Sequence, residues 1–336
     1  MSKLPQKLMG VAALGAVLLA FPAGSALAQG KKIVLAASGI PPIFATVVAY
    51  VAEKEGMFKK YGADVEVRPF ETGTAAARAV AAGDIDIAMA PTALIATQVS
   101  NSDANLVGIW GLPSPDWVLA STDAGKTNCK DIVGQPVGVD AVGGARSIAL
   151  RQMLVGCQGV KIEDVQQVAL SSNTAPAMVA GRLSFGVLHL DDIAVIETQG
   201  KKVHTLLAMN KTNPNNHYLL LAARGDKVKE NRDGYVRTVA ALVDAARFMQ
   251  DPKNADRVAE AAAPTGHNKA IAKGALKQFL DIGFWATKDD GMDRKQIEDV
   301  IAIQVRTGGI TAGKEPVKYE RLVDSTIWKD AAAMVK

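Results

Sequence analysis

Residue groups that carry common catalytic chemistry are scarce in this sequence of 336 residues. Its four histidines, at positions 189, 204, 217 and 267, include no His-x-x-x-His pair for a metal ion. It has no Gly-x-Ser-x-Gly element, and no Gly-Lys-Ser/Thr follows the paired glycines at 143 and 144, so a nucleotide-phosphate site is not expected there. Asp84 and Asp86 stand at a strand entry, and we do not expect them to form a catalytic carboxylate pair. We therefore expect no enzyme, no metal site and no cofactor.

Long apolar runs are missing beyond the first segment, which indicates a soluble chain. Residues 8–21 carry no charge and follow Lys3 and Lys7, but about 14 residues are too few to span a bilayer comfortably. A small-x-small pattern then ends at Ala28, with no cysteine for a lipid anchor. We predict a signal peptide over residues 1–28, cleaved after Ala28, and a location in the periplasm. The alternative is an uncleaved N-terminal anchor.

Strong charge of one sign is also lacking. The formal net charge is only +4, and two of the basic residues belong to the predicted signal peptide. No basic tract is dense enough to suggest nucleic acid as a partner. We expect a monomer.

Cysteine occurs only twice, at positions 129 and 157. An oxidising compartment favours pairing them. A helix that follows a strand runs back along it, which places Cys157 near the start of the strand that follows Cys129. We predict one disulfide, with two buried free thiols as the alternative.

What the sequence does contain is a regular alternation of strands and amphipathic helices. Strands are predicted at 32–37, 64–70 and 85–89, with helices at 43–55, 74–82 and 92–100. The pattern restarts with strands at 136–140, 165–170 and 185–190, and helices at 145–155 and 174–180. Such alternation predicts βαβ units and mostly parallel sheets.

Two extended stretches, 202–209 and 217–223, precede a nearly all-helical tail with helices at 235–249, 255–262, 269–280 and 294–306. A chain that leaves one domain, builds another and returns would produce this order. We predict an α/β protein with two doubly wound lobes joined by a hinge of two crossings, near 117–121 and 217–223. Lobe one would hold residues 29–118 and 222–336, and lobe two residues 119–221.

Four segments resemble a known family. They are residues 52–58 (AEKEGMF), 82–88 (AGDIDIA), 131–139 (DIVGQPVGV) and 178–183 (MVAGRL). Their order and spacing resemble the nitrate/sulfonate/taurine and thiamine-pyrimidine family of periplasmic binding proteins for ABC importers. The sequence departs from that pattern at Ser184 and Phe185, where the family usually has Asp-Ala.

This resemblance implies a type II periplasmic-binding fold, capture of a small molecule between the lobes, and delivery to an ABC permease driven by a separate ATPase. It does not imply which ligand is bound. The alternatives are an exported enzyme or a sensor-partner binding protein on the same fold.

Ligand contacts are expected where strands end, because free amides and helix N-termini gather at that edge of an open α/β sheet. In lobe one, the loops after the three strands provide hydroxyls and a flexible turn. The candidates there are Ser38, Gly39, Pro41, Thr72, Gly73, Thr74 and Thr92. The alternative for the threonines is that they only cap helices.

In lobe two, paired glycines open a helix and Arg146 could clamp a carboxylate or sulfonate. Asn173 and Asp191 could equally be helix caps, and His189 a half-buried structural residue. Trp110 or Trp117 could stack on a ring, with core packing as the alternative for each. The candidates of this half are Gly143, Gly144, Arg146, Asn173, His189, Asp191 and, beside the first crossing, Trp110. The expected ligand is a small polar or anionic compound of the sulfonate, carboxylate or nitrogen-heterocycle class.

Overall fold

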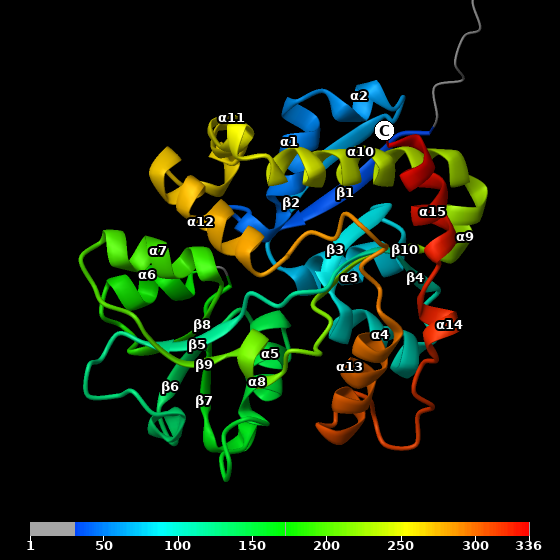
Figure 1. Cartoon of the computed structure of the whole chain (residues 1–336). Helices are drawn as coiled ribbons and strands as arrows, with labels where there is room; N and C mark the ends of the chain where they lie inside the picture. Colours follow the sequence, from blue (N-terminus) through cyan, green and yellow to red (C-terminus); the bar gives the residue numbers. More distant parts are fainter. Residues whose placement is uncertain (1–30, 172, 336) are drawn as a thin grey trace, which may run out of the picture.

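The computed structural model describes residues 31–171 and 173–335, so the predicted signal peptide lies outside the described residues. The chain forms two five-stranded mixed sheets, each flanked by helices (Figure 1). Lobe one is built on the sheet of order β2-β1-β3-β10-β4, and lobe two on the sheet of order β7-β6-β8-β5-β9. The predicted α/β architecture with two lobes is confirmed.

The sheet of lobe one is completed by a strand from late in the chain. Its strands are β1 (Ile33–Ser38), β2 (Val65–Phe70), β3 (Ile87–Pro91), β4 (Leu106–Leu112) and β10 (Leu219–Arg224). Strand β1 pairs in parallel with β2 and β3, whereas β10 is antiparallel to both β3 and β4. The connecting helices are α1 (Val47–Lys54), α2 (Met57–Lys60), α3 (Gly73–Ala82) and α4 (Thr92–Ser102), with a 3-10 turn η1 (Phe44–Thr46) before α1.

Lobe two repeats this plan. Its strands are β5 (Val118–Ser121), β6 (Pro136–Val139), β7 (Gln166–Ala169), β8 (Phe185–Leu188) and β9 (His204–Ala208). Strand β6 is parallel to β7 and β8, and β5 is antiparallel to β8 and β9. Its helices are α5 (Ala145–Leu154), α6 (Thr174–Val179), α7 (Leu190–Thr198) and α8 (Met209–Thr212), with the 3-10 turns η2 (Cys129–Ile132) and η3 (Ile162–Asp164).

The helical tail returns to lobe one after β10. It comprises α9 (Gly225–Glu230), α10 (Arg232–Gln250), α11 (Ala255–Ala261), α12 (Lys269–Asp281), α13 (Arg294–Arg306), α14 (Tyr319–Leu322) and α15 (Ser325–Met334), with the 3-10 turns η4 (Pro252–Asn254) and η5 (Ala263–Thr265). Helix α10 packs on α1 and α15, and α13 packs on α4. Helix α12 reaches across to α7 of lobe two, as Figure 1 shows.

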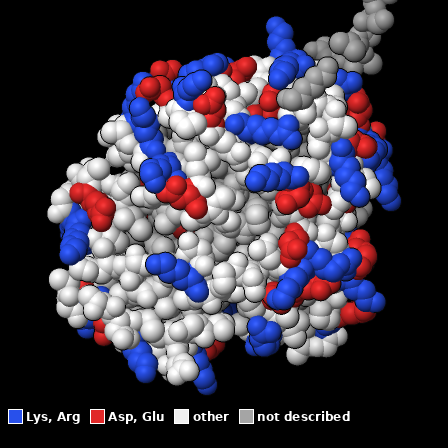
Figure 2. Space-filling view, in the orientation of Figure 1, with Lys and Arg blue, Asp and Glu red and all other residues white. Residues whose placement is uncertain are grey.

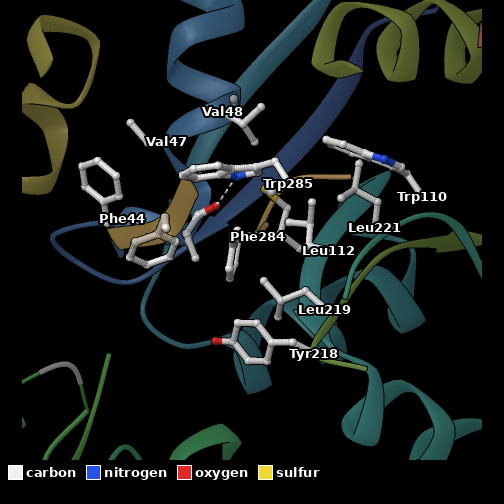
Figure 3. Packing of buried hydrophobic residues seen from close by; sticks show 14 of the residues in the cluster. Phe44, Val47, Val48, Trp110, Leu112, Tyr218, Leu219, Leu221, Phe284 and Trp285 are labelled. Atoms are coloured by element: carbon white, nitrogen blue, oxygen red, sulfur yellow. Dashed lines mark hydrogen bonds between the residues drawn. The ribbon is translucent and has the colours of Figure 1, made fainter. Parts of the chain in front are cut away.

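An aromatic cluster forms the part of the core below α1. Phe44, Phe279, Phe284 and Trp285 pack with ring centroids 4.8–6.5 Å apart. The indole N–H of Trp285 donates to the carbonyl of Ala45, which satisfies its polar atom inside the core. In Figure 3 the rings of Phe44, Phe284 and Trp285 lie to the left of Leu221, and the ring of Trp110 lies next to Leu221. This cluster joins the helical tail to the first helix of the chain.

The predicted disulfide is present. Cys129 begins η2 and Cys157 follows α5, with their Cα atoms 6.2 Å apart. Both cysteines belong to lobe two, so the bond closes a segment within that lobe. It does not tie the two lobes together.

The structure differs from the predicted elements at several places. Strand β4 was not predicted, because Gly108 and Gly111 weaken its β pattern. Glycine is required at position 111, since a Cβ atom there would lie 2.2 Å from the carbonyl oxygen of Gly291. Helix α7 was also missed because it starts directly after β8, with only His189 between them. The sheets are mostly parallel, as predicted, but each contains one crossing strand, β10 in lobe one and β5 in lobe two, that runs antiparallel to both its neighbours.

Candidate functional site

A cavity lies between the facing edges of the two sheets. The carboxyl ends of the parallel strands meet there, as expected for an open α/β sheet. The antiparallel strands β5 and β10 bring their amino ends to the same place. The empty space, open mouth included, is about 420 Å³. Its lining comes from both lobes: Ser38, Gly39, Ile43, Glu71, Thr72, Gly73, Met89, Pro91, Trp117, Asp140, Ala145, Arg146, Ser171, His189, Tyr218 and Leu219.

On the side of lobe one, short polar loops line the cavity. The Ser38 hydroxyl donates to the carbonyl of Met89 at 3.1 Å, which fixes its direction. Gly39 has a φ of +102°, and a Cβ atom there would lie 2.6 Å from the carbonyl oxygen of Pro41. The Thr72 hydroxyl accepts from the amide of Ala75 at 3.0 Å, so Thr72 caps α3 and also lines the cavity. Capping of α3 and contact with a ligand are therefore compatible roles for Thr72.

On the side of lobe two, a carboxylate covers the start of helix α5. Asp140 follows β6, and its two oxygens accept from the amides of Ala145 at 2.8 Å and Arg146 at 2.9 Å. A Cβ atom on Gly144 would lie only 2.7 Å from both oxygens, so glycine is needed for this close approach. The expected role of Gly144 is therefore corrected: it accommodates an internal carboxylate, and the helix amides near it are already bonded.

Arg146 lines the cavity, but its charge is compensated within lobe two. The side chain is only 4% exposed, and its Nη1 donates to the carbonyl of Val187 and to Asp192 Oδ2 at 3.1 Å. The guanidinium also lies over the ring of Trp117, 5.4 Å from its centroid. Arg146 therefore does not present an unbalanced positive charge to a ligand.

Residues just before the two crossing strands form the aromatic wall of the cavity. Trp117 precedes β5 and Tyr218 precedes β10, and their rings meet edge to face at 5.6 Å. His189 packs against Trp117 at 3.7 Å, and its Nδ1 lies 2.6 Å from Asp116 Oδ2. Burial raises the pKa of Asp116, and the nearby His189 offsets part of this rise. Burial, together with the charge of Asp116, also raises the pKa of Tyr218 well above its ordinary value.

A buried ion pair joins the lobes beside the cavity. Asp191 of α7 accepts from Nε2 of His267, the residue two before α12, at 2.9 Å. Burial opposes ionisation of both groups, but their mutual hydrogen bond and the opposite charges around them together outweigh it: the pKa of Asp191 is lowered and that of His267 is raised. His267 also stacks on Phe44 at 6.1 Å. On the opposite side, Arg151 of α5 donates to the carbonyl of Thr307, which follows α13.

The structure brings six of the predicted ligand residues to the cavity and places eight elsewhere. Those that line it are Ser38, Gly39, Thr72, Gly73, Arg146 and His189. Those outside its lining are Pro41, Thr74, Thr92, Trp110, Gly143, Gly144, Asn173 and Asp191.

Three of these eight have a clear structural role or place. Trp110 is fully buried in the core and cannot meet a ligand in the cavity, so the core-packing alternative holds for it. Asn173 is exposed and lines a separate hollow on lobe two, where it makes no side-chain cap bond. Asp191 pairs with His267.

Thr92 has a structural partner as well. Its hydroxyl lies 2.7 Å from Nδ1 of His217, whose Nε2 lies 2.6 Å from the carbonyl of Gly291. A carbonyl only accepts, so Nε2 carries the proton and Nδ1 accepts from Thr92. Burial lowers the pKa of His217 to about 4, which keeps the ring neutral.

Tyr218 and Asp140 were not predicted, and Trp117 was considered as a stacking residue but not kept among the candidates, because the prediction relied mainly on the loops after parallel strands. The signal that would have found the two aromatics was already present, since the crossings were expected near 117–121 and 217–223. A strand that enters the sheet antiparallel starts at the edge where its neighbours end. The residues directly before the crossing strands should therefore have been candidates.

Charge on the surface is mixed. Basic and acidic side chains intermingle over the face in Figure 2, and uncharged side chains occupy most of its middle. None of the helices within the described ranges combines the length and apolar character needed to span a bilayer.

Comparison with known proteins agrees with this architecture. The periplasmic nitrate-binding protein NrtA from Synechocystis PCC 6803 superposes with a TM-score of 0.71 at 13% identity, over 92% of this chain and 90% of its own. The alkanesulfonate-binding protein SsuA from Xanthomonas axonopodis pv. citri, bound to MOPS, gives 0.72 at 13%, over 88% and 99%. These likenesses show the periplasmic-binding fold.

Relatives that match by sequence cover a smaller share of this chain than the solved structures do. A binding protein of Brucella abortus (strain 2308) is 24% identical over 212 residues, which are 62% of this chain and 65% of the relative, just under two thirds of its length. The model of the family described as NMT1/THI5 like matches residues 44–255, more than half of the sequence. The chain therefore belongs to the NMT1/THI5-like family.

Proposed function

We propose that this protein is the periplasmic solute-binding component of an ABC importer. It captures a small polar organic solute between its lobes and delivers it to the membrane permease. The observation that carries this proposal is a single cavity lined by both sheets, with polar loops from lobe one facing Arg146, Trp117 and His189. A ligand that contacts both lobes favours their closed arrangement by its differential affinity for that state.

The lining supports a compact ligand with one flat face. Trp117 and Tyr218 offer ring faces and edges, while Thr72, Arg146 and His189 offer polar groups around them. The cavity is narrow, because the space in which the centre of a water molecule can move is about 40 Å³. Closure around a sulfonate, a carboxylate or a nitrogen heterocycle of one ring would fill it.

The test is a thermal-shift screen of the chain from residue 29, using methanesulfonate, taurine, benzoate, cytosine and thymine as probes. For any compound that stabilises the protein, calorimetry should give one site per chain. For a compound with a ring, Trp117→Ala should weaken that binding about 5- to 150-fold, because base-like rings lose about 1–3 kcal/mol when an aromatic partner is removed.

The matched control is Trp328→Ala on α15, outside the cavity lining, which should bind like the wild type. Equal affinity of Trp117→Ala and the wild type would place the ligand elsewhere. Recovery of the compound chemically unchanged supports transport, whereas steady turnover would favour the alternative of an exported enzyme.

A further inference from the structure

The carboxylate of Asp140 occupies a position that a helix N-terminus otherwise offers to an anion. Helix α5 has ten residues, its first two residues line the cavity, and the helix dipole favours negative charge at this end. Both oxygens of Asp140 accept from these amides. The side chain comes from the strand that leads into the helix, so the protein supplies its own anion at this end of the cavity.

The surroundings of Asp140 show that this position is built into the lobe. The residue is only 7% exposed although it lines the cavity. Gly144 leaves no room for a side chain against the carboxylate, because a Cβ atom would lie 2.7 Å from its oxygens. An external anion would therefore have to displace a carboxylate that is already bonded.

The guanidinium of Arg146, which also lines the cavity, does not invite a second anion. Its charge is already balanced by Asp192 at 3.1 Å, and Asp140 adds a carboxylate to the cavity lining. Glu71 adds a further acidic side chain on the rim of lobe one. The wall formed by lobe two therefore repels an anionic group in a desolvated space, where like charges interact strongly.

We propose that Asp140 is a specificity-determining residue that excludes anionic groups from the lobe-two side of the cavity. The favoured ligand presents an uncharged or positively charged edge there, such as ring nitrogens or an amine. Each carboxylate oxygen keeps a second lone pair that can accept an N–H from that edge. This inference rests on the proposed function, and it narrows the ligand class toward nitrogen heterocycles and away from compounds whose anionic group would face lobe two.

The experiment uses formate as a probe that replaces the missing carboxylate. Asp140→Ala removes the internal anion and leaves the amides of α5 open to the cavity. Sodium formate, compared with sodium chloride at equal ionic strength, should raise the melting temperature of Asp140→Ala by about 2 °C or more at saturation. The wild type should show no formate-specific rise, because its site is already filled.

The matched control is Asp324→Ala. Asp324 caps α15, which also has ten residues, but lies outside the cavity lining. This variant should not respond to formate beyond chloride, since its exposed helix end is bathed in water. A formate effect that is absent from Asp140→Ala, or equal in all three proteins, would overturn the proposal.

Asp140→Asn covers the case in which the alanine variant does not fold. This near-isosteric change removes the charge, and sulfate measured by calorimetry should bind the asparagine variant at least about tenfold more tightly than the wild type. Equal sulfate affinities would contradict the proposal. These probes do not depend on the natural ligand, so a negative result here differs from a failure of every compound to bind the wild type.

Discussion

At the scale of single residues, Arg146 was expected to clamp an anionic ligand, and the structure gives it a different set of partners. Its guanidinium is buried between Asp192, the carbonyl of Val187 and the ring of Trp117. Arg146 helps to order the wall of the cavity, because its guanidinium packs on the ring of Trp117. Its contact with a ligand remains a prediction.

We predict that Arg146→Ala destabilises the protein by about 3–5 kcal/mol, because removing one member of a buried pair leaves the other uncompensated. In an Asp192→Asn background the same change should cost less, with a coupling of about 0.5–3 kcal/mol. Urea unfolding of the four proteins of this cycle measures both values. Additive losses would show that the ion pair contributes nothing specific.

At the scale of elements, the three-residue contact of Thr92, His217 and Gly291 fixes the start of α4, the approach to β10 and the loop before α13. The folded pKa of His217, about 4, lies below the ordinary value of 6.5. Between these values the unfolded chain binds a proton that the native protein does not. Stability is therefore lost as the pH falls from 6.5 to 4.

We predict that this single group accounts for about 3 kcal/mol of the loss over that range. His217→Gln should be less stable than the wild type at neutral pH but should lose less stability on acidification. The control is His204→Gln in β9, a half-buried position of lobe two, which should keep the wild-type pH profile. Parallel profiles for the wild type and His217→Gln, from urea unfolding at several pH values, would refute this assignment.

Much of the fold at this scale follows from sequence pattern, and the exceptions share a physical cause. Helix α13 has the predicted bounds, and β2 and α3 differ by one residue each. Strand β4 was missed because its glycines serve close packing against Leu220 and Gly291, which no local pattern reveals. About half of the candidate site was unpredictable for a similar reason. The local sequence does not reveal whether Gly144 lies against a ligand or against the carboxylate of Asp140.

At the scale of the whole molecule, the lobes are joined outside the two chain crossings by contacts on both sides of the cavity. Asp191 pairs with His267 on one side, and Arg151 bonds to Thr307 on the other. The aromatic chain from Trp117 through Tyr218, Phe284 and Phe279 to Phe44 ends at His267. The cavity and the lobe contact are thus parts of one packed unit.

We predict that closure weakens at alkaline pH. The pKa of His267 is raised by its pairing with Asp191 despite burial, so the pair is fully formed below pH 6.5 and is lost as the pH rises through that raised value. Small-angle scattering should show an expanded molecule above this transition. In His267→Gln the radius of gyration should no longer change with pH, and His204→Gln again serves as the control.

The order of synthesis imposes its own constraint on this architecture. Strand β10 lies between β3 and β4, yet it emerges from the ribosome only after all of lobe two. Lobe two is continuous from β5 to β9 and can pair its strands as soon as they are made. The sheet of lobe one stays incomplete between β3 and β4 until β10 has been synthesised. A strand cannot pair before its partner exists, and long-range strand pairing is slow. A nascent chain of this protein therefore carries an open, unfinished first half until residue 224 has been added.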